Sequence, residues 1–283
     1  MPGFCTDSNA QLPADLIDRY GVEVVPLTVT VDGRDYLEGV DLAADDFYAR
    51  FERGTAPAVS TAAPSPGRFL DAYQRLVARG ATEILSVHIG SALSGTVNSA
   101  RLAAAEVGVP VRIVDTGTAS FAIACCLWEA AEAVAKGADL EEAAEVAEQV
   151  AATVVNVFVV QALDLARAGG RLSPTAPTAT DANAAAGIPV LSLVDGKIEP
   201  IGSARTVDDA AESMAAFIRN AGANLRVGLS IADAGAAPMW QALEQRLLDA
   251  PEVLDLVRYR IAPSVGVHTG PGTAGAVAYP ANT

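Results

Sequence analysis

The sequence contains little histidine, cysteine or aromatic side chain, and this scarcity argues against several kinds of site. Only two histidines and three cysteines occur among 283 residues, and there is no Cys-x-x-Cys pair. Structural zinc sites are built mainly from these two residue types, so no metal site is expected. Cys5, Cys125 and Cys126 make an odd count, and we expect them to be buried, reduced thiols of a cytoplasmic protein.

Basic residues are also scarce. Lys and Arg number 19 against 34 Asp and Glu, which gives a formal net charge of -15. Such a chain is repelled by polyanions, so nucleic acid and anionic membrane surfaces are excluded as main partners. A small anionic ligand is not excluded, because the free N–H groups at one helix start can outweigh a distant net charge.

Long hydrophobic runs are missing as well. The longest apolar stretch, 150–163, is interrupted by Asn156 and Gln161 and is too short to span a bilayer. The first five residues lack the basic region and apolar core of a signal peptide. We therefore expect a soluble, cytoplasmic protein without an integral membrane segment.

The chain is nevertheless rich in small apolar residues, and their pattern predicts an α/β fold. A length of 283 residues favours two domains. Up to residue 153, expected strands alternate with expected helices. This alternation predicts a parallel sheet covered on both faces, a three-layer α/β/α domain. The expected strands are 22–31, 84–89 and 109–114, and the expected helices are 66–79, 94–106, 119–136 and 140–153.

Beyond Asn156 the pattern changes to one that favours a mixed sheet with helices in two layers. Asp195-Gly196 separates two apolar runs and is a strong hairpin signal, as is Asp32-Gly33 in the first half. A segment rich in Pro, Thr and Ala, 173–186, is expected to be a loop. We place the domains at 1–156 and 157–283. The expected strands are 157–160, 190–194, 197–204, 225–231 and 257–261, and the expected helices are 163–168, 207–220 and 238–248.

Polar residues follow several of the expected strands of the first domain. Ser91 and Ser94-Gly95-Thr96 follow strand 84–89, and Asp115-Thr116 follows strand 109–114. In a doubly wound sheet, ligands bind at these carboxyl ends. Hydroxyls and free N–H groups at helix starts suit a carboxylate or phosphate, although each such residue alone is also an ordinary helix cap.

Two further polar residues, His268 and Arg171, allow both a structural and a functional interpretation, whereas His88 is given a structural one. His268 lies among glycines that allow close approach of the backbone to a ligand. Arg171, after Gly169-Gly170, either caps a helix or reaches a ligand. His88 ends an apolar strand and is interpreted as a satisfied core or edge residue.

A hydrolase site could be assembled from Ser91 or Ser94 with His268 and Asp115. However, the sequence contains no Gly-x-Ser-x-Gly nucleophile elbow, which disfavours this reading.

A series of short motifs runs in order along almost the whole chain, and in this order they resemble the DegV family. Members of that family include the acyl-binding subunits of bacterial fatty-acid kinase. The motifs are Thr6-Asp7-Ser8, Tyr20 with Val24-Val25-Pro26-Leu27, Thr61 with Pro64-Ser65-Pro66, Ser91-Ala92-Leu93-Ser94-Gly95-Thr96, Val114-Asp115-Thr116, Gly169-Gly170-Arg171-Leu172-Ser173, Arg205, and His268-Thr269-Gly270-Pro271-Gly272.

The resemblance implies two α/β domains with one long-chain fatty acid buried between them. Thr61 and Ser91 would hold the carboxylate, and the nearby ligand-binding residues would be Ser94, Gly95, Arg171, Arg205 and His268. It further implies a lipid-binding protein with no catalytic residue, metal or cofactor of its own. A separate kinase would phosphorylate the carboxylate that this protein presents.

Four positions depart from the family pattern. Ala62 and Ala63 replace a Ser-Gln pair, Gly90 replaces the first serine of its motif, and Ile188 replaces a lysine. We therefore expect the chain to bind an acyl group despite these four changes. The changes bear instead on the expected presentation of the acid to a kinase partner. A Ser–His acyl hydrolase, a relative of sugar kinases and a binding protein for another small anion stay open as alternatives.

Overall fold

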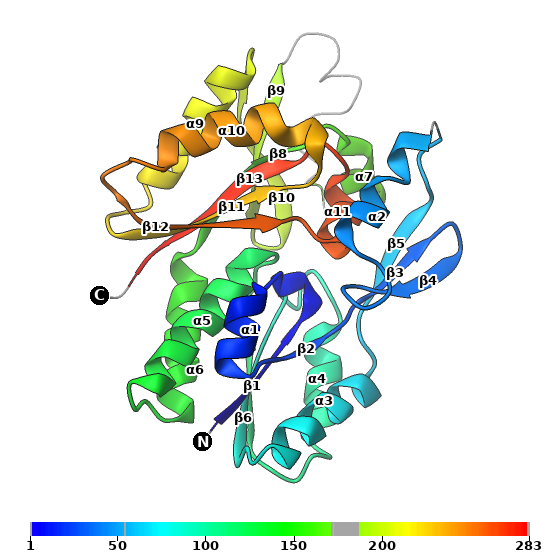
Figure 1. The fold of residues 1–283 in the computed structure, drawn as a ribbon, viewed down its shortest axis with the longest axis vertical. Coiled ribbons are helices and arrows are strands. Elements are labelled where there is room, and N and C mark those ends of the chain that lie inside the picture. The colour runs from blue at the N-terminus through cyan, green and yellow to red at the C-terminus, as the bar shows by residue number, and fades with distance from the viewer. Residues whose placement is uncertain (1, 54, 171, 173–186, 282–283) are drawn as a thin grey trace. The chain divides into compact units, whose positions relative to one another are not determined.

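The computed structural model describes residues 2–53, 55–170, 172 and 187–281, which form two compact units (Figure 1). The first unit comprises Met1–Thr30, Arg34–Asp41 and Thr61–Ala152, and the second comprises Val31–Gly33, Leu42–Ser60 and Thr153–Thr283. The second unit thus includes two short segments that lie before residue 61. Among the described residues, no helix is long and apolar enough to cross a membrane.

The first unit is built on a parallel four-stranded sheet of order β2-β1-β6-β7. Thr6 is paired with Val24 on one side and Val87 on the other, and His88 is paired with Asp115. The strands are β1 (Pro2–Asp7), β2 (Glu23–Val25), β6 (Glu83–His88) and β7 (Val111–Asp115).

Helices cover both faces of this sheet, so the predicted three-layer architecture is confirmed (Figure 1). Successive residues of β1 face opposite layers. Phe4 lies edge-on against Tyr20, whereas Cys5 packs in a core cluster with Phe69 and Ala100. The helices are α1 (Ala14–Tyr20) and α5 (Phe121–Ala135), with α6 (Leu140–Thr153), on one side, and α3 (Pro66–Ala78) and α4 (Thr96–Ala104) on the other.

The three cysteines are free and buried, as predicted. Burial raises the pKa of Cys126 to about 12, with one hydrogen bond opposing the shift. The thiol is therefore protonated at neutral pH and behaves as a small apolar side chain.

The expected strand 22–31 is wrong as a single element, because Pro26-Leu27 interrupts it. β2 joins the parallel sheet, whereas β3 (Thr28–Val31) joins a three-stranded sheet of order β4-β3-β5. A proline has no N–H to donate to a ladder, which favours the break. The other strands are β4 (Arg34–Leu37) and β5 (Val59–Ala62). The predicted turn at Asp32-Gly33 is confirmed, with φ of 50° and 79°.

The second unit contains a six-stranded mixed sheet of order β10-β9-β8-β13-β11-β12. All neighbours pair antiparallel except β11 and β12. Asp195 and Gly196 turn the predicted hairpin with φ of 48° and 74°. The strands are β8 (Val155–Val159), β9 (Ile188–Val194), β10 (Lys197–Ala204), β11 (Leu225–Ile231), β12 (Val253–Arg260) and β13 (Ala274–Pro280).

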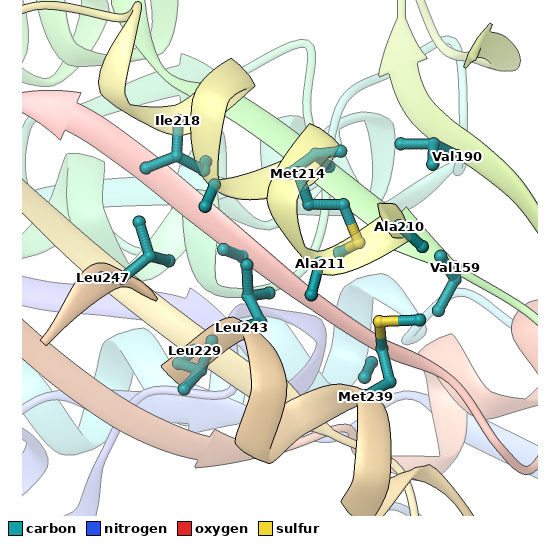
Figure 2. Close-up of a cluster of buried hydrophobic side chains, with 14 of the residues drawn as sticks. Val159, Val190, Ala210, Ala211, Met214, Ile218, Leu229, Met239, Leu243 and Leu247 are labelled. Atoms are coloured by element: carbon teal, nitrogen blue, oxygen red, sulfur yellow. The ribbon is translucent and has the colours of Figure 1, made fainter. Parts of the chain in front are cut away.

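Two amphipathic helices, α9 (Val207–Arg219) and α10 (Ala237–Leu247), pack their apolar faces on this sheet and confirm the two-layer prediction. Figure 2 shows Met214 of α9, Leu243 of α10 and Leu229 of β11 among the buried side chains of this core cluster. Thr206 caps α9 by accepting a hydrogen bond from the N–H of Asp209 at 3.1 Å. The unit also holds α2 (Ala44–Tyr48), α7 (Leu163–Ala168) and α11 (Pro263–Thr269).

Strand β13 was not predicted from the sequence, although it pairs on both sides. Its residues Ala274-Gly275-Ala276 have low strand propensity. A Cβ on Gly275 would lie 2.6 Å from Phe158 Cβ, so small residues are required there by the neighbouring strand. The expected loop 173–186 lies outside the described residues.

Candidate functional site

The candidate site of the first unit lies at the carboxyl ends of β1, β6 and β7. β1 and β6 are neighbours in the sheet, but β1 leads to α1 on one face and β6 leads to α4 on the other. The chain therefore diverges between these two strand ends. In open α/β sheets such a switch point is the usual place for a ligand.

The loop from Ser91 to Thr96 follows β6 and leads directly into α4. The carbonyl of Gly90 accepts hydrogen bonds from the N–H groups of Leu93 at 2.9 Å and Ser94 at 3.1 Å. Ser94 Oγ lies 2.8 Å from Thr96 Oγ1. Gly95 is the cap residue of α4 and has no side chain, and the N–H of Thr96 is accepted instead by Ser94 Oγ at 3.3 Å. The positive end of the helix dipole thus lies beside the hydroxyl of Ser94, which favours an anion.

The Thr61 motif lies next to this loop. A Cβ built on Gly95 would lie 3.8 Å from the Cβ of Ala63, which is ordinary van der Waals distance. Thr61, two residues earlier at the end of β5, is half-buried, and Ser91 is exposed. The structure therefore brings together, within one unit, the two motifs that were proposed to hold a carboxylate.

Gly90 explains one of the four departures from the family pattern. A Cβ at this position would lie 2.7 Å from the carbonyl carbon of Gly117, and the N–H of Gly90 donates to the carbonyl of Thr118 at 2.8 Å. A serine side chain does not fit between these backbones without a shift of the loop after β7.

Asp115 is bonded to the same loop. Its Oδ1 accepts the N–H of Ser91 at 3.0 Å and the N–H of Gly117 at 3.2 Å. Partial burial opposes ionisation, but the hydroxyl and the N–H of Ser91, the N–H of Gly117 and the charge of Arg101 together lower the pKa of Asp115. This carboxyl is therefore ionised at neutral pH.

Beneath the loops lies a buried polar network that the sequence analysis did not identify. His88 Nδ1 is 3.0 Å from Asp7 Oδ2, and His88 Nε2 is 2.6 Å from Ser86 Oγ. Ser86 Oγ is in turn 2.9 Å from the hydroxyl of Tyr73. His88 is thus a satisfied core residue, as predicted. The only signal in the sequence was that positions 86 and 88 share one face of a strand.

This network has the bonding order of the Asp–His–Ser triad of hydrolases. All three side chains are 0% exposed, however, and Ser86 also bonds Tyr73. A substrate carbonyl cannot reach Ser86 in this fold. Of the residues named for a hydrolase, Ser91, Ser94 and Asp115 belong to the first unit and His268 to the second.

In the second unit, His268 lies in the last turn of the short helix α11 and packs on the end of α7. A Cβ on Gly169 would lie 2.3 Å from His268 Nδ1, so only glycine leaves room for the imidazole. A Cβ on Gly270 would meet Ala162, and one on Gly272 would meet Gln161. At these two positions the space next to the glycine Cα is occupied by other residues of the protein, so it is not available to a ligand.

The two predicted arginines are less informative. Arg205 is exposed and lies between β10 and α9, directly before the cap residue of that helix. Arg171 lies outside the described residues. Within the described part of the chain, no group of three or more His, Cys, Asp or Glu side chains could hold a metal ion.

Comparison with known proteins extends the similarity over the whole chain. A family model described as "Uncharacterised protein, DegV family" matches residues 4–281. A DegV domain-containing protein of Streptomyces coelicolor is 36% identical over 273 residues, 96% of each chain. A DegV domain-containing protein of Mycobacterium tuberculosis is 33% identical over 275 residues, 95% of this chain and 94% of its own.

Two solved structures share both fold and sequence with the chain. A DegV family protein from Thermus thermophilus, described as fatty-acid-binding, superposes with a TM-score of 0.86 at 31% identity. A Thermotoga maritima protein, described as revealing a fatty-acid-binding function, superposes with a TM-score of 0.84 at 27% identity. In both cases the match covers 99% of each chain.

Proposed function

This chain belongs to the DegV family, and from that premise we propose that it binds a long-chain fatty acid. The observation that carries the proposal is the full-length match to the Thermus thermophilus and Thermotoga maritima proteins, both described as binding fatty acid. The proposal also places the protein in the cytoplasm, where free thiols such as its three cysteines stay reduced.

For the head group we propose Thr61 and Ser91 as the carboxylate-binding pair, with Ser94 and Gly95 beside them. An ionised carboxylate accepts several hydrogen bonds, and its burial is costly unless it receives them. Ser94 lies at the N-terminus of α4, and Ala63 of the Thr61 motif lies within van der Waals distance of a Cβ on the cap residue Gly95. This supports the assignment. His268, Arg171 and Arg205 are the further ligand-binding residues of the proposal.

The tail would supply most of the affinity. Burial of each methylene is worth ~0.8 kcal/mol, so a long acyl chain offers on the order of 10 kcal/mol before ordering costs are subtracted. In this scheme the protein is a carrier and not a catalyst, and a separate fatty-acid kinase subunit phosphorylates the carboxylate that it presents. The resemblance of the ordered motifs to kinase-associated members supports this step.

Mass spectrometry of an organic extract of the purified full chain tests the central claim. We expect a co-purifying fatty acid, and saturable uptake of palmitate after delipidation. A protein that carries no fatty acid and takes up none after delipidation would contradict it. Turnover of acyl esters that disappears in Ser91→Ala would instead favour the hydrolase.

A further inference from the structure

The hydroxyls of Ser94 and Thr96 share a hydrogen bond whose direction is decided by burial. Their oxygens lie 2.8 Å apart, and by distance alone either hydroxyl could donate. Thr96 is 0% exposed, however, and among the described residues Ser94 is the only partner of its hydroxyl. A buried hydroxyl hydrogen without an acceptor is costly. Thr96 is therefore the donor, and Ser94 Oγ is the acceptor.

The oxygen of Ser94 then has no further capacity to accept. It also accepts the backbone N–H of Thr96 at 3.3 Å, and a serine hydroxyl offers two lone pairs and one hydrogen. Both lone pairs are used by Thr96, whereas no group in the described part of the chain accepts the hydrogen. Ser94 is half-buried, so this hydrogen can still reach a ligand.

This donor lies in the proposed head-group site. The N–H of Ser94 donates to the carbonyl of Gly90 at 3.1 Å, and the next residue, Gly95, lies beside Ala63 of the Thr61 motif. An ionised carboxylate only accepts hydrogen bonds, so it matches a hydroxyl that can only donate. Hydrogen bonds in a chain polarise one another, so the bond that Ser94 accepts from Thr96 makes Ser94 a stronger donor.

We propose that Thr96 is a positioning residue that makes Ser94 a donor and thereby gives the site its preference for an ionised acid over the corresponding amide. This inference rests on the proposed function. Because Thr96 is completely buried, it acts through Ser94 and not by contact with the ligand. An amide carbonyl can accept from Ser94 only without the help of a charge, and the amide NH₂ group meets no available lone pair on Ser94.

Thr96→Val tests this role, because valine keeps the branched shape and lacks the hydroxyl. Titration calorimetry on delipidated full chain would use dodecanoate and dodecanamide as probes. In the variant, Ser94 loses the bond that polarises it and regains a lone pair. We expect dodecanoate to bind about three- to tenfold more weakly, and dodecanamide to change by less than about twofold, because Ser94 can then accept from its NH₂ group.

Ser94→Ala separates the polarity of the hydroxyl from packing. Alone it should weaken dodecanoate binding about tenfold, and adding Thr96→Val in that background should have no further effect. Thr96→Ser keeps the hydroxyl and should restore the preference of the parent. Thr6→Val is the matched control, because it removes an equally buried hydroxyl from β1, one that donates to the carbonyl of Val87 at 2.7 Å. It should leave both affinities unchanged.

A folded Thr96→Val protein with the preference of the parent, or an equal loss in both backgrounds, would overturn the inference and leave fatty-acid binding intact. Ser94→Ala that bound dodecanoate like the parent would overturn it as well. Thr96→Ala, with the same expected result, is the second variant if the valine variant folds poorly. A parent that bound no dodecanoate or longer acid would contradict the proposed function itself.

Discussion

Asp7 Oδ2 lies 3.0 Å from His88 Nδ1, and both side chains are completely buried at the ends of neighbouring strands β1 and β6. The Asp7 carboxylate also accepts the N–H of Asn9 and the N–H of Ile89, each at 3.1 Å. One carboxylate therefore joins the two loops that leave the switch point of the sheet.

Replacing Asp7 should be strongly destabilising. Asp7→Ala removes the acceptor of two buried N–H groups and of the imidazole, and we expect the free energy of unfolding to fall by about 3–5 kcal/mol. Urea unfolding measures this, with Asp71→Ala on the exposed face of α3 as the control. Equal midpoints for the two variants would show that the network contributes nothing to stability.

The proposed head-group pair predicts two unequal losses of affinity. Thr61→Ala should weaken palmitate binding by about 1.5–3 kcal/mol, as expected for a hydrogen bond to a charged group. Ser91→Ala should cost less, about 1 kcal/mol, because Ser91 is exposed and water can replace the lost hydrogen bond, whereas Thr61 is half-buried. Titration calorimetry with palmitate measures both affinities. Ser203→Ala, which removes an exposed hydroxyl of the second unit, is the control and should bind palmitate like the parent. Unchanged affinity in both would place the head group elsewhere.

Gly90→Ser restores the residue that the family pattern has, yet we expect it to destabilise this chain. The new Cβ would lie 2.7 Å from the backbone of Gly117, and overpacking of this kind costs about 1–3 kcal/mol. Gly67→Ala, in the first turn of α3, has its nearest neighbour at 3.8 Å and should be neutral or stabilising. Thermal unfolding compares the two, and a fully stable Gly90→Ser protein would contradict the prediction.

Gly169→Ala should displace the imidazole of His268 without disturbing the backbone. The φ of Gly169 is -74°, which alanine adopts freely, but its Cβ would lie 2.3 Å from Nδ1. The chain has only two histidines, so the imidazole NMR signals are easily assigned with His268→Ala. We expect the His268 signal to shift and the His88 signal to stay. Two unshifted signals would mean that the ring tolerates the methyl group.

His268→Ala should still co-purify with fatty acid but should not be phosphorylated by a competent kinase. An imidazole can donate to a carboxylate or an acyl phosphate near neutral pH, whereas the energy of the tail comes from apolar walls. The parent protein is assayed first, because Ile188 stands where the family has a lysine. Phosphorylation as fast as the parent's would make His268 a structural residue.

The local chemistry of the sequence was sufficient to predict most elements. Ser65-Pro66 starts α3, with Ser65 Oγ accepting the N–H of Arg68, and Asp195-Gly196 turns the β9–β10 hairpin. Such signals depend on residues close together in the chain, so they are readable without the fold. The ordered motifs similarly led to the family, because their sequence of residue types is specific.

What only the tertiary structure decided depends on residues far apart in the chain. Asp7 and His88 are 81 positions apart, and the sequence around either residue does not indicate that their side chains are hydrogen-bonded. The engagement of Ser91 by Asp115, the room for His268 over Gly169 and the strand formed by Ala274-Gly275-Ala276 are of the same kind. In each case burial and the space left by a neighbouring element, rather than local propensity, determine the outcome.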